Sequence, residues 1–157
     1  MKELELKIQI HECQFADLTD EERQLLNEAI EATERSYAKY SQFHVGASVV
    51  LQNGVHVMGC NQENAAFPAG ICAERSAIFA AGAQYPDQPV RMLAIAARNT
   101  KGELTEEPVS PCGTCRQVMI ETETRFQQPI RILLYGQRRI FVMDGIRQLM
   151  PLSFNEF

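Results

Sequence analysis

The 157-residue chain contains no tryptophan and only three histidines, and aromatic residues make up just 8% of it. It has no run of about 18 consecutive apolar residues, which excludes a typical transmembrane helix. The N-terminal stretch MKELELKIQIHE also lacks the uninterrupted apolar segment of a secretory signal peptide. We therefore expect a cytoplasmic protein that makes no membrane contact.

Basic residues are also in the minority, with 15 Lys and Arg against 20 Asp and Glu, which gives a net charge of −5. No cluster of Lys and Arg interrupts this acidic balance. Because binding to a nucleic-acid backbone depends on cationic side chains that neutralise phosphates, a nucleic-acid partner is disfavoured. A neutral small molecule remains compatible with this charge. The length fits one domain, residues 1–157.

Hydrophobic periodicity predicts a mixed α/β fold. The dipeptide Asn53-Gly54 separates two β-rich runs between Val45 and Asn61, which is a strong hairpin signal. Thr19 and Glu22 have the spacing of a capping box, so a helix is expected from there to about Tyr40. The further expected strands are 4–15, 90–97, 130–135 and 139–143, and the further expected helices are 71–83, 110–126 and a short one after 144. The sequence predicts a mixed central sheet of about five strands sandwiched by helices.

Two cysteine motifs carry the strongest chemical signal. They are Cys72-Ala73-Glu74-Arg75 and Pro111-Cys112-Gly113-Thr114-Cys115, and each lies at the start of an expected helix. A helix N-terminus stabilises anions, thiolates included, and thiolates are strong zinc ligands. If adjacent parallel strands lead into the two helices, both helices begin at the same edge of the sheet.

The number of cysteines favours a catalytic zinc over a structural one. A structural zinc site normally has four protein ligands, whereas three leave a position for water. Glu74, two residues after Cys72, is placed to act as a general acid and base. Three thiolates overcompensate the charge of Zn²⁺, and either Arg75 or Arg116 could donate hydrogen bonds to the sulfurs.

Other interpretations of these cysteines remain open. Cys112 and Cys115 could form a redox pair, although Cys72 and Glu74 would then have no role. A structural zinc with Cys60 or a histidine as its fourth ligand is a second alternative. Without such a site, Cys60 is an ordinary buried thiol, as Cys13 is expected to be.

The sequence resembles the small homotetrameric zinc-dependent cytidine deaminases from about Glu22 to Phe154. The Cys-Ala-Glu and Pro-Cys-x-x-Cys motifs carry the resemblance first. Three further segments extend it: 37–47 (YAKYSQFHVGA), 59–66 (GCNQENAA) and 149–154 (LMPLSF). Together these motifs are far more specific than a single Cys-x-x-Cys pair.

The resemblance implies a role for each matching residue. Cys72, Cys112 and Cys115 would bind zinc, Glu74 would transfer protons, and Arg75 would temper the thiolate charge. The substrate contacts implied are the backbone N–H of Ala73 with the base carbonyl, Phe43 packed on the base, Asn61 and Glu63 on the ribose 3′-hydroxyl, and Phe154 from a neighbouring subunit.

The implied activity is hydrolytic deamination of cytidine and 2′-deoxycytidine to uridine and 2′-deoxyuridine, with release of ammonia, in pyrimidine salvage. The implied assembly is a homotetramer. The sequence departs from the family at Lys39, where a proline is usual, and at Phe67, where a tyrosine is frequent. Residues 1–20 exceed the usual start and are expected to form an added edge strand or an oligomer contact.

Alternative functions follow from the same residues. A related enzyme could deaminate a cytosine-containing antibiotic or a modified nucleoside, although Asn61 and Glu63 favour a ribose. The domain could also be a non-catalytic module whose zinc only stabilises the fold, but Glu74 would then have no role.

Overall fold

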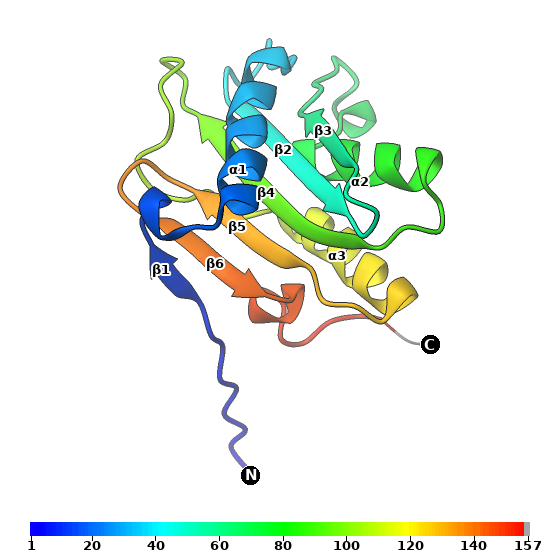
Figure 1. The fold of residues 1–157 in the computed structure, drawn as a ribbon. Coiled ribbons are helices and arrows are strands. Elements are labelled where there is room, and N and C mark those ends of the chain that lie inside the picture. The colour runs from blue at the N-terminus through cyan, green and yellow to red at the C-terminus, as the bar shows by residue number, and fades with distance from the viewer. Residues whose placement is uncertain (156–157) are drawn as a thin grey trace.

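Six strands form one mixed sheet in the computed structural model of the chain, which describes residues 1–155. Their spatial order is β1-β6-β5-β4-β2-β3, and Figure 1 shows them side by side. The predicted mixed sheet is confirmed, with six strands in place of about five. The strands are β1 (His11–Cys13), β2 (His44–Leu51), β3 (His56–Cys60), β4 (Val90–Arg98), β5 (Arg131–Tyr135) and β6 (Ile140–Asp144).

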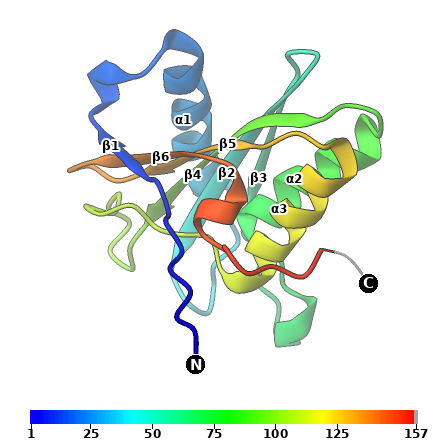
Figure 2. The ribbon, with the colours of Figure 1, turned by 90° about the horizontal axis from the view of Figure 1, so that it is seen from below.

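Helices cover both faces of the sheet (Figure 2). Helix α1 (Asp20–Ala32) lies on one face, and α2 (Ala73–Gln84) and α3 (Gly113–Phe126) lie on the other. Two hydrophobic clusters fill the space between the layers. The cluster beneath α1 includes Leu25, Leu26 and Leu133, whereas the cluster beneath α2 and α3 includes Ile95 and Met119. Within residues 1–155, no helix has both the length and the apolar character that a membrane crossing requires.

The start of α1 agrees with the prediction from the sequence, but its end does not. Thr19 accepts a hydrogen bond from the Glu22 backbone N–H, and the Glu22 carboxylate accepts one from the Thr19 N–H, which completes the capping box. The helix ends at Ala32 and a 3₁₀ turn follows at Thr33–Arg35, well before Tyr40. The hydroxyls of Thr33 and Ser36 donate to nearby backbone carbonyls, and such local bonds compete with helix continuation.

The N-terminal strand is much shorter than predicted. Only His11–Cys13 pair with β6, antiparallel and at the edge of the sheet, with His11 opposite Val142. This register places residue 9 opposite Asp144, the last residue of β6. Residues 4–8 therefore have no neighbouring strand to pair with.

The elements near the C-terminus also differ in their bounds. Cys112, and not Ser110, is the N-cap residue of α3, so Pro111 precedes the cap. The segment after β6 forms only a 3₁₀ turn, Ile146–Gln148, with Gly145 as its N-cap residue.

Strand directions place the starts of α2 and α3 at one edge of the sheet. Strand β2 pairs antiparallel with both β3 and β4, so β3 and β4 run in the same direction. The chain enters α2 after β3 and α3 after β4, and α3 leads to β5, which is parallel to β4. The sequence-based assumption of adjacent strands was wrong, because β2 lies between β3 and β4. The two helices nevertheless begin at the same edge.

Gly46 allows α1 to approach β2 closely. A Cβ atom at this position would lie 2.1 Å from the Ala29 carbonyl oxygen and 2.5 Å from the Thr33 backbone nitrogen. Both neighbours are backbone atoms, which cannot rotate away. Gly82 on α2 differs, because a Cβ atom there would meet no atom within 4 Å.

We expect Gly46→Ala to lower the free energy of unfolding by about 3 kcal/mol, because overpacking must displace α1. The matched control Gly82→Ala should raise it by up to about 1 kcal/mol, since alanine favours the helical conformation. Urea denaturation of both variants measures these changes. A Gly46→Ala variant as stable as the unsubstituted protein would contradict this account of the packing.

Candidate active site

Two helix N-termini bring three cysteines together. Cys72 is the N-cap residue of α2, Cys112 is the N-cap residue of α3, and Cys115 lies buried in the first turn of α3. The Sγ atoms of Cys72 and Cys112 are 3.9 Å apart, and those of Cys112 and Cys115 are 3.5 Å apart. All three sulfurs lie within 4.8 Å of one another, which brings the three predicted metal ligands into one cluster.

The spacing of the sulfurs fits a tetrahedral metal ion. A zinc–sulfur distance of about 2.3 Å places tetrahedral thiolates roughly 3.8 Å apart. Cys60 does not join the cluster, because its thiol donates to the Arg35 carbonyl at 3.3 Å. Across residues 1–155, these three cysteines form the only group of three or more Cys, His, Asp or Glu side chains close enough to share an ion. Three ligands leave a fourth position for water.

Charge around the cluster favours a thiolate at Cys72. The pKa of its thiol is lowered to about 5, chiefly by a hydrogen bond from Cys115 and further by the Arg75 guanidinium. Arg75 reaches the sulfur with its Nη2 atom at 3.8 Å, from one turn further along α2. The pKa of Cys115 is raised, because its thiol is the donor to Cys72 and is buried.

Arg116, the other candidate for this role, has a different environment. Its Nε–H donates to the Pro111 carbonyl at 2.8 Å and its Nη1–H donates to the Leu149 carbonyl at 2.7 Å. These bonds join the loop before Cys112 to the C-terminal segment. Nothing in the local sequence distinguishes the two arginines, because each directly follows a motif residue.

Glu74 lies in the first turn of α2, only 4% exposed, and lines the same cavity as Cys72 and Cys112. Burial raises the pKa of its carboxyl above the ordinary value, and the Cys72 thiolate raises it further. A carboxyl in such an environment accepts and returns a proton more readily near neutral pH than an exposed one does. The structure thus places a buried carboxyl with a raised pKa at the sulfur cluster.

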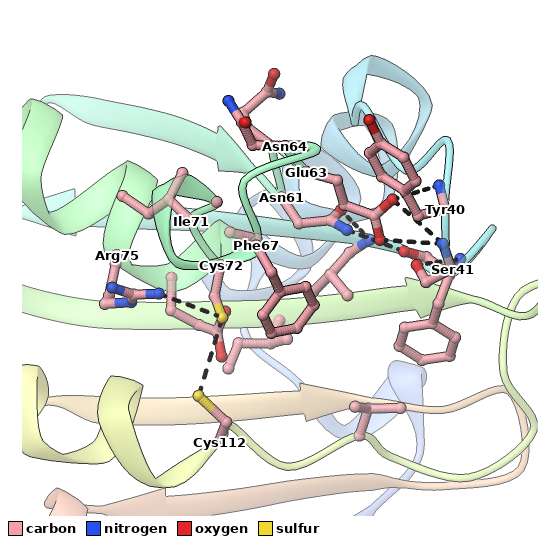
Figure 3. A pocket seen from close by; sticks show the side chains of 18 of the residues that line it. Tyr40, Ser41, Asn61, Glu63, Asn64, Phe67, Ile71, Cys72, Arg75 and Cys112 are labelled. Atoms are coloured by element: carbon pink, nitrogen blue, oxygen red, sulfur yellow. Dashed lines mark hydrogen bonds between the residues drawn. The ribbon is translucent and has the colours of Figure 1, made fainter.

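The cavity next to the cluster has a volume of about 710 Å³, enough for a small organic molecule. In Figure 3, Arg75 and Cys112 both lie next to Cys72, and Asn61, Glu63, Tyr40 and Ser41 lie at the other end. Of the sequence-predicted residues, the cavity is lined by Phe43, Asn61, Glu63, Cys72, Ala73, Glu74, Arg75 and Cys112. The sequence predicted no role in the site for Tyr40, Ser41, Ile71 and Ser110, although Tyr40 and Ser41 lie in segment 37–47, which carries part of the family resemblance.

Asn61 and Glu63 hold the backbone of the opposite wall. The Asn61 side chain accepts from the Val45 N–H at 2.8 Å and donates to the Phe43 carbonyl at 2.9 Å. The Glu63 carboxylate accepts from the backbone N–H groups of Tyr40 and Ser41, the former at 2.7 Å (Figure 3). Both side chains keep unused capacity, since an amide nitrogen has two hydrogens and a carboxylate has several lone pairs.

Two phenylalanines line the cavity from different elements. Phe43 follows Gln42, whose φ of 55° lies in the left-handed region. The Phe43 backbone N–H donates to the Ser41 hydroxyl at 3.0 Å. Phe67 belongs to the 3₁₀ turn Phe67–Ala69 and is 90% exposed at the cavity (Figure 3).

Phe154 lies outside the cavity of its own chain. It is not among the lining residues, and its side chain is largely exposed. Its carbonyl accepts a hydrogen bond from Gln117 of α3 at 2.7 Å, which fixes the backbone of this segment. Of all the predicted substrate contacts, it is the one that a single chain does not bring to the site.

Comparison with known proteins identifies the family. The family model for the cytidine and deoxycytidylate deaminase zinc-binding region matches residues 19–127. The chain belongs to this family. That assignment confirms the resemblance carried by the cysteine motifs, although the matched region ends before residues 149–154.

Individual deaminases show the same relationship. A cytidine deaminase from Halalkalibacterium halodurans is 41% identical over 97 residues, which cover 62% of this chain and 68% of that protein. One from Mycobacterium tuberculosis is 34% identical over 110 residues, covering 68% and 77%. The crystal structure of the Burkholderia pseudomallei cytidine deaminase superposes with a TM-score of 0.73 at 35% identity, covering 87% of this chain and 100% of that one. The deaminase-like fold is therefore confirmed.

The role of Arg75 in this family site can be tested by titration. In metal-free protein, Arg75→Gln should raise the pKa of Cys72 from about 5 toward neutral pH, because a cationic donor is removed. Ultraviolet absorbance of the thiolate against pH measures the change. Arg125→Gln is the control, since Arg125 donates to the Pro86 carbonyl and contacts no sulfur. An unchanged midpoint in Arg75→Gln would show that the guanidinium does not stabilise the thiolate.

Proposed function

We propose that the protein is a zinc-dependent cytidine deaminase that converts cytidine and 2′-deoxycytidine to the corresponding uridines and ammonia, as in pyrimidine salvage. The observation that carries the proposal is the buried Glu74 carboxyl beside three sulfurs whose spacing fits one tetrahedral ion. Membership of the deaminase family and the cytidine deaminases among its relatives support it.

In this proposal Cys72, Cys112 and Cys115 hold zinc. Zinc held there would supply Lewis acidity, so that a water molecule loses a proton more readily. The Glu74 carboxylate accepts that proton as the water oxygen bonds to C4 of the base, and it delivers the proton to N3. Glu74 then transfers the remaining hydroxyl proton to the amino group, which leaves as ammonia while the C4 carbonyl forms. Water and cytidine are consumed, and uridine and ammonia are produced.

The remaining residues orient the nucleoside in the proposed complex. The N–H of Ala73 is one of the first donors of α2, which have no partner inside the helix, and it would meet the base carbonyl. Phe43 supplies an aromatic surface for the pyrimidine. The unused donor and acceptor capacity of Asn61 and Glu63 would bind the ribose 3′-hydroxyl.

The proposed assembly is a homotetramer in which Phe154 completes a neighbouring site. The exposed side chain of Phe154 and its fixed backbone support a contact outside its own chain. A second support is the apolar groove between α2 and α3, where Phe79 is 50% exposed. A surface of this kind is typical of a protein interface.

We expect Glu74→Gln to lower kcat for cytidine by about 100- to 10,000-fold while zinc content stays unchanged, because the amide cannot take up a proton. Ammonia release and metal analysis on the same sample measure both quantities. Cys112→Ser is the contrasting variant, and it should lose zinc together with activity. A Glu74→Gln enzyme with normal turnover would refute the proton-transfer role.

A non-catalytic zinc module predicts a different result from the unsubstituted protein. Fully metallated protein that releases no ammonia from cytidine would favour that alternative. An enzyme for a cytosine-containing antibiotic would act on the antibiotic faster than on cytidine.

The charges of the cavity distinguish nucleosides from nucleotides. Arg75 is the only basic side chain among the described lining residues, and it is already hydrogen-bonded to Cys72. Glu63, at the other end, is an acid whose pKa is lowered, chiefly by its hydrogen bond from Ser41, so it is ionised at neutral pH. Within this described lining, a phosphate would meet a single cation, whose charge is offset by the Cys72 thiolate, and would also face the Glu63 carboxylate.

We therefore expect kcat/KM for cytidine to exceed that for cytidine 5′-monophosphate by at least about 100-fold, since like-charge contacts cost several kcal/mol. Steady-state ammonia release from the two substrates measures the ratio. Glu63→Gln should lower this ratio of kcat/KM values, because a neutral amide does not repel the phosphate. Comparable rates for the two substrates would contradict this specificity.

A further inference from the structure

The first ten residues form an extended arm that leaves the sheet (Figures 1 and 2). Its sequence alternates, with the apolar residues Leu4, Leu6, Ile8 and Ile10 on one side and polar residues on the other. The apolar side chains are 39–75% exposed. An alternating pattern with one apolar face is typical of a strand that buries that face.

The arm has no strand partner in its own chain. The outermost hydrogen bond between the arm and the rest of the chain runs from the Gln9 backbone N–H to the Gln148 side chain, at 2.7 Å. Within residues 1–155, no hydrogen bond or ion pair connects residues 2–8 to the remainder. β1, which continues the arm, is itself an edge strand. Unpaired backbone groups at such an edge are a template for pairing with another chain.

The charge pattern of the arm favours pairing with the arm of a second copy of this chain. In antiparallel pairing about a two-fold axis, the residue at the centre of the register lies opposite the same residue of the partner. A register centred on Glu5 therefore pairs two glutamates, and a register centred on Lys7 pairs two lysines. Like charges directly opposite each other are destabilising. A register centred on Leu6 instead places Glu5 opposite the partner's Lys7, twice, and Leu4 opposite the partner's Ile8. The apolar and charged faces are then both complementary.

We propose that residues 2–10 pair antiparallel with the same residues of a second copy of this chain, centred on Leu6. For residues 2–10, the residue numbers of each facing pair then add up to 12. The contact is isologous, so one arm sequence supplies both of its halves. The arm contributes no residue to the lining of the cavity, and the proposal does not depend on the proposed function.

Cysteine cross-linking tests the register in the full-length protein. Leu6→Cys places two thiols directly opposite each other, within the distance that a disulfide requires. In the Glu5→Cys or the Lys7→Cys variant alone, the two introduced cysteines are diagonal neighbours across the contact. They lie about 7–8 Å apart, which is too far for a disulfide. A mixture of these two variants again places two thiols opposite each other.

Under mild oxidation we expect Leu6→Cys to form covalent dimers at least about tenfold faster than Glu5→Cys or Lys7→Cys alone. The equimolar mixture of the last two should cross-link at about half the rate of Leu6→Cys, because about half of the dimers then contain one copy of each variant; non-reducing gel electrophoresis measures the rates. The unsubstituted protein is the control for its five native cysteines. Equal rates at the three positions, or no dimer above the control, would overturn the proposal.

A charge exchange in the Leu6→Cys background provides an independent test. Glu5→Lys and Lys7→Glu each place two like-charged pairs across the contact, so each should slow cross-linking by about tenfold. The combination of both substitutions restores opposite charges and should restore the rate. If the combined variant remains as slow as the single ones, the register is wrong. Neither residue lines the cavity, so the rate of ammonia release per chain serves as a folding control.

Discussion

Three sulfur atoms can share one ion here only because two helices begin at the same edge of the sheet. Cys72 and Cys112 are both N-cap residues, and 40 positions of sequence separate them. Their approach depends on β3 and β4 running in the same direction on either side of β2. The helix N-termini also favour the charged form of the ligands. Topology therefore supplies both the geometry of the cluster and part of its electrostatics.

The opposite wall of the cavity depends on side chains that support the backbone. Asn61 joins the end of β3 to the start of β2, and Glu63 holds the turn at Tyr40 and Ser41. The Asn61 contacts are partly buried, so their loss would leave backbone groups unpaired. The same side chains face the cavity with unused hydrogen-bonding capacity. A substrate contact at these positions would therefore be pre-organised by the fold and not by a flexible loop.

Most of the predicted site residues that the structure brings together belong to short local motifs, which is why the sequence could predict them. The two cysteine motifs, Glu74 and the Asn53-Gly54 hairpin could be recognised from short-range patterns. The extent of β1 could not, because the alternation in residues 4–10 says nothing about where β6 ends. The end of α1 depends on bonds made by Thr33 and Ser36, which compete with a continuing helical pattern. The different contacts of Arg75 and Arg116 follow from tertiary placement alone.

The sulfur cluster and the charge of the cavity are connected through one cation, Arg75. Three thiolates exceed the charge of a divalent ion, so the cluster requires a nearby positive group, and Arg75 occupies that position. Arg75 is the only basic side chain in the described lining of the cavity, and its charge is offset by the Cys72 thiolate that its Nη2 atom contacts. The acid Glu63 is likewise engaged with backbone N–H groups and keeps its negative charge. The charge balance that a three-cysteine site demands thus leaves a cavity suited to an uncharged sugar.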